Sequence, residues 1–293
     1  MQKYKILIFG AGGMLGHKLC QLLPKMGYEV IATHRSEKVQ NQEIYTEVTN
    51  IPSINVLDPI ALERVFKLTK PDFVINCIGI VKQLDAAHNR YLSVAINAYL
   101  PHQLNNLCEK YYTRMIHIST DCVFSGNKGM YTESDPSDAN DLYGKSKFLG
   151  ETDANQIRAL TLRTSIIGHE LKSNTHGLLA WFLKQRNSTV NGFKNAFFSG
   201  FTTNEIANVI HHIITKHPTL SGMYHLASNR ISKFDLLTLI NDEYNLNITI
   251  NPESDFHCDR SLDMSKFIEA TGYQAPLWSS MIHQMHTEQG NRT

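Results

Sequence analysis

The first half of the chain alternates short apolar runs with longer stretches in which apolar residues recur every three or four positions. Short β-branched runs predict buried strands, whereas the longer spacing predicts amphipathic helices. The predicted strands are residues 5–9, 29–33, 73–77, 115–119 and 160–164, and the predicted helices are residues 14–26, 61–68, 92–111 and 143–155. This alternation predicts an α/β fold of the Rossmann type, a doubly wound parallel sheet with helices on both faces.

The pattern changes after about residue 166. Apolar runs become shorter, Asn, Ser and Thr become more frequent, and helices are predicted at residues 178–184, 204–216 and 233–244. We therefore expect a Rossmann domain at residues 1–165 and a smaller, mixed lobe at residues 166–293, with some segments of the lobe returning to the first domain.

Composition favours neither a nucleic-acid nor a membrane partner. The 293 residues carry a formal net charge of +1, so no field of one sign is expected over the surface. The first apolar run is too short for a secretory signal and is interrupted by glycines, and no later run approaches the length of a membrane span. We expect a cytoplasmic protein.

Cysteine and histidine usage gives no sign of a disulfide framework or a metal site. The five cysteines are scattered, without a C-x-x-C pair, which is typical of reduced thiols. The 14 histidines include no H-E-x-x-H motif, so we expect no metal.

A glycine-rich turn follows the first predicted strand. Gly10, Gly13 and Gly16 have the spacing G-x-x-G-x-x-G, and Met14 and Leu15 lie within it. Glycine allows a tight turn and close approach of a pyrophosphate, whose charge is held by amides at the helix N-terminus. The turn therefore predicts a dinucleotide site; the alternative is an ordinary turn before a helix.

The end of the second predicted strand discriminates between the two nicotinamide cofactors. An NAD enzyme usually places Asp or Glu there to accept from the ribose 2′-hydroxyl, but this chain has Arg35. A guanidinium, helped by Lys38, suits a 2′-phosphate. We expect NADP(H) in the first domain; a solvated surface arginine is the alternative.

A Y-x-x-x-K motif is formed by Tyr143 and Lys147. A chain with 12 tyrosines gives about one such match by chance, so the context decides. Upstream, a predicted strand ends in hydroxyl residues at Ser119 and Thr120. On a helix, residues four apart share a face, so the ammonium can favour the phenolate electrostatically.

Taken together, the chain resembles the extended short-chain dehydrogenase/reductases, and among them the sugar-nucleotide reductase branch that includes dTDP-4-dehydrorhamnose reductase. The segments that carry the resemblance are residues 10–16, 73–79, 96–98, 119–124, 143–147, 162–165 and 260–263.

The resemblance implies a role for each of three residues. Tyr143 would be the proton donor, Lys147 would lower its pKa and hold the nicotinamide ribose, and Thr120 would hydrogen-bond the reacting carbonyl. A phenol and a hydroxyl placed in this way can neutralise the charge left on oxygen after hydride transfer. The alternative is that Thr120 and Tyr143 are helix-cap and core residues.

The same resemblance implies the surrounding contacts. Cys77, Ile78 and Gly79 would line the nicotinamide cleft, and Asp58 would lie near the adenine. The residues expected to face the substrate are Lys82, Gln83, Thr120, Asp121, Cys122, Ser165 and Arg260, with Arg163, Thr164 and His169 as further candidates in the substrate-binding lobe. For Lys82 and Gln83, helix capping in solvent is an equal alternative.

One position helps to choose the reaction. Nucleotide-sugar 4,6-dehydratases typically follow the Thr-Asp pair with a glutamate base, and here the residue is Cys122. A neutral thiol is a poor substitute, which disfavours dehydration. Reduction of the 4-keto group of a dTDP- or UDP-linked 6-deoxyhexose, for surface polysaccharide precursors, is expected.

Two other functions remain open. One is nucleotide-sugar epimerisation, although the absence of an acid near Arg35 disfavours the tightly bound NAD of epimerases. The other is a regulatory subunit that binds NADP without turnover, as in the β subunit of methionine adenosyltransferase, which resembles the same family. The nucleotide, the sugar and the oligomeric state, including a homodimer, are not decided by the sequence.

Overall fold

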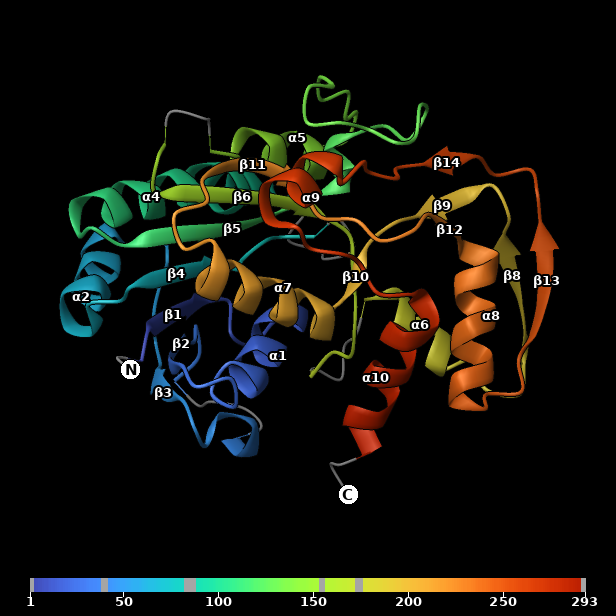
Figure 1. The fold of residues 1–293 in the computed structure, drawn as a ribbon, viewed down its shortest axis with the longest axis horizontal. Helices are drawn as coiled ribbons and strands as arrows, with labels where there is room; N and C mark the ends of the chain where they lie inside the picture. Colours follow the sequence, from blue (N-terminus) through green and yellow to red (C-terminus); the bar gives the residue numbers. More distant parts are fainter. Residues whose placement is uncertain (1–2, 38–41, 82–87, 153–155, 172–175, 291–293) are drawn as a thin grey trace.

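A parallel sheet of seven strands forms the larger part of the molecule (Figure 1). The computed structural model describes residues 3–37, 42–81, 88–152, 156–171 and 176–290. The strand order is β11-β6-β5-β4-β1-β2-β3. The strands are β1 (Lys5–Phe9), β2 (Glu29–Thr33), β3 (Thr49–Ile51), β4 (Phe73–Asn76), β5 (Arg114–Thr120), β6 (Ala159–Thr164) and β11 (Gly222–His225). The sheet confirms the predicted doubly wound α/β fold.

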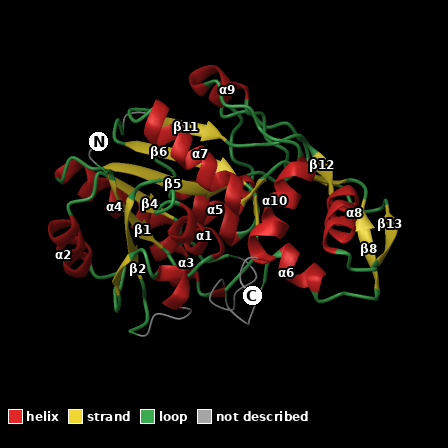
Figure 2. Cartoon of the chain, turned by 60° about the horizontal axis from the view of Figure 1, so that its bottom comes forward, coloured by secondary structure: helices red, strands yellow, loops and turns green. Residues whose placement is uncertain are grey.

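Helices cover both faces of this sheet because its strands are apolar on both sides (Figure 2). In β1, Ile6 and Ile8 join the core beneath α1 and α7, whereas Leu7 and Phe9 join the core beneath α2 and α4. The helices are α1 (Met14–Leu22), α2 (Pro59–Thr69), α4 (Leu100–Lys110) and α7 (Thr203–Lys216). Successive side chains of β1 therefore point to opposite faces of the sheet and pack into two separate hydrophobic cores.

The helix predicted at residues 92–111 is wrong in detail, because it is broken into three consecutive segments. These are α3 (Arg90–Ser93), a π-helix (Val94–Tyr99) and α4. Pro101 lacks the N–H that would bond to the Asn97 carbonyl in a regular helix. The Asn97 side chain instead fixes Ile80, accepting from its N–H at 2.8 Å and donating to its carbonyl at 3.0 Å.

Two other predicted helices end earlier than expected. Helix α1 ends at Leu22, two residues before Pro24, which cannot continue the helical hydrogen bonds. Helix α5 (Leu142–Leu149) ends at Leu149, with Gly150 as its C-cap, and not at the predicted residue 155. Residues 153–155 lie outside the described part of the chain. The starts of both helices are close to those predicted.

A smaller lobe lies on the right in Figure 1. It contains the pair β8 (Thr189–Phe193) and β13 (Thr249–Glu253), and the three-stranded sheet of β9 (Ala196–Phe198), β12 (Ile231–Ser232) and β14 (Cys258–Asp259). Its helices are α6 (Leu178–Leu183), α8 (Lys233–Tyr244) and α10 (Trp278–Gly290). The short strands β7 (Ile166–Ile167) and β10 (Phe201–Thr202) pair with each other.

The chain returns to the large sheet after residue 166. Strand β11 pairs with β6 at the sheet edge, α7 packs against α1, and α9 (Ser265–Thr271) contacts β11. The division into residues 1–165 and 166–293 stays a prediction. Within the described residues, no helix has the length and apolar character needed to cross a membrane.

Candidate functional site

A cleft of about 700 Å³ opens at the carboxyl edge of the large sheet, with the smaller lobe forming its other wall. Since all seven strands are parallel, the segments that follow β1, β4, β5 and β6 meet at this one edge. The predicted site residues that line the cleft are Gly13, Met14, Leu15, Cys77, Ile78, Gly79, Thr120, Asp121, Cys122, Tyr143, Lys147, Ser165 and Arg260. The structure therefore brings most of the predicted site together.

The glycine-rich turn joins β1 to α1 at the floor of this cleft. Gly10 has a φ of +88°, and its carbonyl oxygen accepts from the Gly13 N–H at 3.0 Å. A Cβ atom on Gly16 would lie 2.1 Å from the Gly10 carbonyl oxygen, so only glycine fits there. Gly13 has no side chain to cap α1, which leaves the first amides of the helix able to hold an anion.

Four predicted cofactor contacts lie outside the lining of this cleft: Gly10 and Gly16 of the turn, Arg35 and Asp58. Arg35 is exposed just after β2, whose carboxyl end lies beside that of β1. Asp58 is also exposed and caps α2, accepting from the Ile60 N–H at 2.9 Å. Lys38, Lys82 and Gln83 lie outside the described residues.

Thr120 and Tyr143 form a hydroxyl pair in the cleft. Thr120 is the last residue of β5, and its hydroxyl donates to Asp121 Oδ1 at 3.2 Å. Asp141 caps α5, accepting from the Gly144 N–H at 2.7 Å, and so starts the helix that carries Tyr143. Burial raises the pKa of Tyr143 well above its usual range, and the Thr120 hydroxyl opposes this shift by a smaller amount.

Lys147 lies one helical turn after Tyr143 and is buried. Its ammonium donates to the Ile118 carbonyl oxygen at 2.8 Å and lies 3.4 Å from Nε2 of His117. Burial lowers the pKa of Lys147 to about 8, with the Glu151 charge opposing the shift. Burial and the Lys147 charge lower the pKa of His117, so this imidazole stays neutral at physiological pH.

The sequence matches the RmlD substrate binding domain family over residues 4–289. The chain belongs to this family. Spore coat polysaccharide biosynthesis protein SpsK from Bacillus subtilis (strain 168) is 31% identical over 261 residues, which is 84% of this chain and 81% of the relative. A dTDP-4-dehydrorhamnose reductase from Mycobacterium tuberculosis (strain CDC 1551 / Oshkosh) is 30% identical over 152 residues, 50% of this chain and 44% of the relative.

Solved structures show the same fold as this member of the RmlD substrate binding domain family. A hypothetical dTDP-4-dehydrorhamnose reductase from Sulfolobus tokodaii superposes with a TM-score of 0.77 at 28% identity, covering 94% of this chain and 99% of the other. The reductase from Bacillus anthracis str. Ames, solved in complex with NADP, has a TM-score of 0.76 at 20% identity and covers 98% and 100%.

Two of the further candidates for substrate contacts, Arg163 and His169, do not lie in the cleft. Arg163 does not line the cleft; it is buried in β6 and forms an ion pair with Glu151 at 2.7 Å. Side chains alternate along a strand, so Arg163 points to the opposite side from Leu162. His169 is hydrogen-bonded to the Tyr244 hydroxyl at 2.9 Å and is also absent from the lining. Thr164 and Ser165 do line the cleft.

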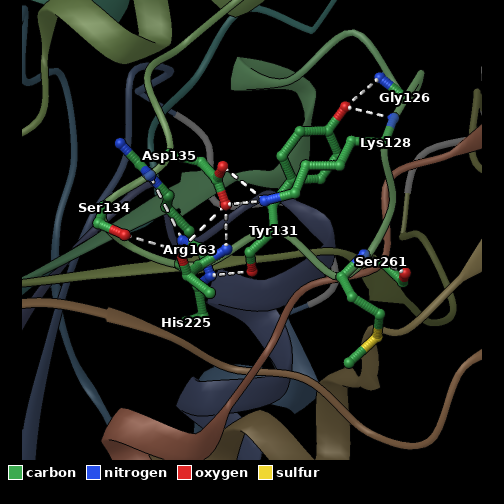
Figure 3. Close-up of polar contacts among 10 residues, drawn as sticks. Gly126, Lys128, Tyr131, Ser134, Asp135, Arg163, His225 and Ser261 are labelled. Atoms are coloured by element: carbon green, nitrogen blue, oxygen red, sulfur yellow. Dashed lines mark hydrogen bonds and ion pairs between the residues drawn. The ribbon is translucent and has the colours of Figure 1, made fainter.

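A hydrogen-bonded loop after β5 holds Arg260 in the cleft. The Tyr131 hydroxyl accepts from the N–H groups of Gly126 and Lys128, and its carbonyl oxygen contacts Nδ1 of His225 (Figure 3). The Tyr131 N–H donates to the Ser261 carbonyl oxygen at 2.9 Å. The Arg260 side chain in turn donates from Nε to the Phe124 carbonyl oxygen at 2.8 Å.

Sequence reasoning missed most of the cleft wall that the smaller lobe supplies. The missed lining residues include Glu170, His176, Phe193, Phe198, Lys233 and Phe256. For Lys233 a signal was present: Ser232 caps α8, accepting from the Asp235 N–H at 2.9 Å, which places the lysine at the first helical position. Among the described residues, no group of three His, Cys, Asp or Glu side chains could hold a metal ion.

A second depression, of about 680 Å³, lies at the amino edge of the sheet. Several of its cations already have partners on the protein. Lys67 and Lys110 pair with Glu63, and Arg158 pairs with Glu109. These three cations are therefore already compensated by carboxylates and are poor candidates for holding a ligand.

Gly16→Ala tests the geometry of the turn. Its methyl group would meet the Gly10 carbonyl, so we expect the free energy of unfolding to fall by about 1–3 kcal/mol and dinucleotide binding to weaken. Gly12→Ala is the matched control, because a Cβ there meets nothing within 4 Å. Urea unfolding of both variants measures the difference, and equal stabilities would contradict the close approach of Gly16 to Gly10.

Proposed function

We propose that this protein is an NADP(H)-dependent oxidoreductase that reduces the 4-keto group of a nucleotide-linked 6-deoxyhexose. The observation that carries the proposal is the meeting of Thr120, Tyr143 and Lys147 in one cleft with the glycine-rich turn. Relatives named dTDP-4-dehydrorhamnose reductase support the reaction class and a dTDP-linked substrate, and a UDP-linked substrate is the alternative. SpsK, named a spore coat polysaccharide biosynthesis protein, supports a place in the synthesis of surface polysaccharide precursors, which we propose to be cytoplasmic.

The residues at the floor of the cleft fit a dinucleotide. Gly10 packs closely against Gly16, so the turn leaves room for a bound group above it. The N-terminal amides of α1, which no side chain caps, suit a pyrophosphate. Arg35 follows β2, where the adenosine ribose binds in this fold, and Asp58 would lie towards the adenine. NADPH, when bound, supplies the hydride for the keto carbon.

The hydroxyl pair supplies the proton. Thr120 and Tyr143 would both hydrogen-bond the keto oxygen, and Tyr143 would donate its proton as that oxygen gains negative charge. A raised pKa keeps Tyr143 protonated at physiological pH, which is the form that reduction requires. Lys147, anchored by the Ile118 carbonyl, places a positive charge behind the phenol and would hold the nicotinamide ribose.

Around this centre, Cys77, Ile78 and Gly79 would contact the nicotinamide, and Asp121, Cys122, Ser165 and Arg260 would contact the substrate. Cys122 occupies the position where dehydratases carry a glutamate base, and a thiol at this position favours reduction over dehydration.

A homodimer belongs to the same proposal. Large apolar side chains are exposed along consecutive helical segments, with exposed fractions of 79% at Tyr91 and 58% at Tyr99. Helix α5, which packs against this region, also exposes Phe148 and Leu149. Apolar side chains gathered on one face are typical of a protein–protein interface.

The proposed reaction is tested with purified protein, NADPH and a panel of dTDP- and UDP-linked 4-keto-6-deoxy sugars. We expect one NADPH oxidised per product and a gain of two hydrogens on the nucleotide sugar by mass spectrometry. The free keto sugar should react poorly, because remote binding energy orients the reacting carbon. An epimer formed without a change in the cofactor would identify an epimerase, and NADPH binding without turnover across the panel would identify a regulatory subunit.

Tyr143→Phe removes the proton donor while keeping the ring. We expect the fold and NADPH affinity to be retained and turnover to fall by about two to four orders of magnitude. Stopped-flow or steady-state NADPH oxidation measures the loss, and fluorescence titration measures binding. Near-normal turnover in a folded, NADPH-binding variant would exclude Tyr143 as the donor.

Arg35→Ala tests the cofactor preference. The parent protein should bind NADPH more tightly than NADH, and the variant should narrow this gap by about 1–3 kcal/mol because it loses charge-assisted hydrogen bonds to the 2′-phosphate. Titration of both proteins with both cofactors gives the four affinities. Equal affinities in the parent protein would contradict the assignment of Arg35.

A further inference from the structure

Lys233 brings a positive charge into the cleft from the smaller lobe. It is the first residue of α8, is half-buried and lines the cleft. Its ammonium lies 4.1 Å from the centre of the Phe198 ring. In the described ranges, this amine forms no hydrogen bond or ion pair with another residue. A ring face compensates only part of the cost of removing an ammonium from water.

Arg260 places a second cation against the same groups. Its Nε donates to the Phe124 carbonyl, but its terminal nitrogens form no hydrogen bond or ion pair with another described residue. Lys233 and Arg260 both interact electrostatically with Asp121, Cys122 and Cys258, and Arg260 also acts on Lys233. Asp141 also acts on Arg260, so the two cations lie among two carboxylates and two thiols, and none of these four groups forms a hydrogen bond or ion pair with either cation within the described residues.

The position of Lys233 links the catalytic residues to an aromatic pair. On one side lie Asp121 and Cys122, which directly follow Thr120. On the other side, Phe234 packs against Gly192, the residue before Phe193. Phe193 and Phe256 line the cleft with exposed rings whose centres are 4.9 Å apart. Exposed rings of this kind suit stacking of a nucleobase.

We propose that Lys233 is a substrate-binding residue that contacts the diphosphate of the nucleotide sugar, together with Arg260. The inference rests on the proposed function for its substrate class, but it concerns binding rather than turnover. With the sugar at Thr120 and Tyr143, the diphosphate is the anionic part of the substrate and would lie between the sugar and the nucleobase. The Lys233 ammonium and the terminal nitrogens of the Arg260 guanidinium, which form no hydrogen bond with another described residue, suit its oxygens.

The ionisation of Lys233 gives this contact a pH dependence. Burial lowers the pKa of Lys233 to about 8, with Asp121, Cys122 and Cys258 opposing the shift and Arg260 adding to it. Only the ammonium form attracts a diphosphate, so affinity should fall as pH rises through this pKa. An arginine at the same position stays charged and should remove this part of the fall.

The test is a calorimetric titration of the full chain with dTDP and with UDP. Lys233→Met should weaken binding of the diphosphates by about ten- to a hundredfold, the usual effect of losing a hydrogen bond to a charged group. Binding of thymidine, uridine and NADPH should be unchanged. Lys194→Met is the matched control, because this exposed lysine also lies over a ring, 5.7 Å from the centre of Phe234, but is not part of the cleft lining.

Lys233→Arg provides a second readout. The parent protein should lose affinity for dTDP between about pH 7 and pH 10, and the arginine variant should lose clearly less. The pKa of Lys147 is also about 8, but the parent and both variants keep this group. The difference in pH dependence between Lys233→Arg and the parent therefore reports the ionisation of Lys233 alone.

Several outcomes would overturn the proposal. The first is that Lys233→Met binds dTDP and UDP as tightly as the parent, and the second is that it loses equal affinity for thymidine and dTDP. The third is that it loses affinity for the nucleotide sugar but not for dTDP or UDP. The fourth is that the parent binds neither diphosphate. Failure of the proposed function is a separate result. It would appear as tight diphosphate binding that depends on Lys233 together with no oxidation of NADPH by any keto sugar.

Discussion

The site depends on one constraint, which is that β1, β4, β5 and β6 run parallel and end at the same edge of the sheet. The order places β1 between β2 and β4, so the chain leaves the sheet to opposite faces at this point and opens a crevice. The glycine-rich turn, the segment after Asn76, and Thr120 meet there although they are far apart in sequence. The direction and order of the strands are therefore enough to bring these three segments together.

The smaller lobe is held to this edge by backbone hydrogen bonds from the loop that follows β5. Tyr131 donates to the Ser261 carbonyl and accepts from the Asp263 N–H, while Gly126 accepts from the Asp259 N–H at 2.7 Å. Gly126 has a φ of +91°, and a Cβ there would lie 2.7 Å from Cys258 Sγ. Strand β5 ends in Thr120, and the loop that follows it is hydrogen-bonded to the segment that carries Arg260. The position of β5 therefore fixes both walls of the cleft.

The sequence predicts the elements well and leads to residues that line the cleft, because both follow from local patterns. Periodicity placed β1, β2 and α8 with the bounds that the structure has, and the turn and the Y-x-x-x-K motif led to the cleft. Tertiary contacts decide the remainder. Arg163 is next to Thr164 in sequence, yet strand alternation turns it towards Glu151, and Lys233 reaches the cleft only because β12 and β9 pair.

The electrostatics of the cleft favour Tyr143 as a proton donor rather than as a base. Burial holds the proton on Tyr143, while one helical turn away Lys147 donates to the Ile118 carbonyl and, together with burial, keeps the pKa of His117 low. A developing alkoxide is stabilised by such an arrangement, whereas abstraction of a proton from carbon requires an ionised base. At the position where a carboxylate base would stand, the chain has Cys122. The same cleft carries Lys233 and Arg260, which act electrostatically on this thiol, and in the proposed function these two cations would hold the anionic diphosphate of the substrate.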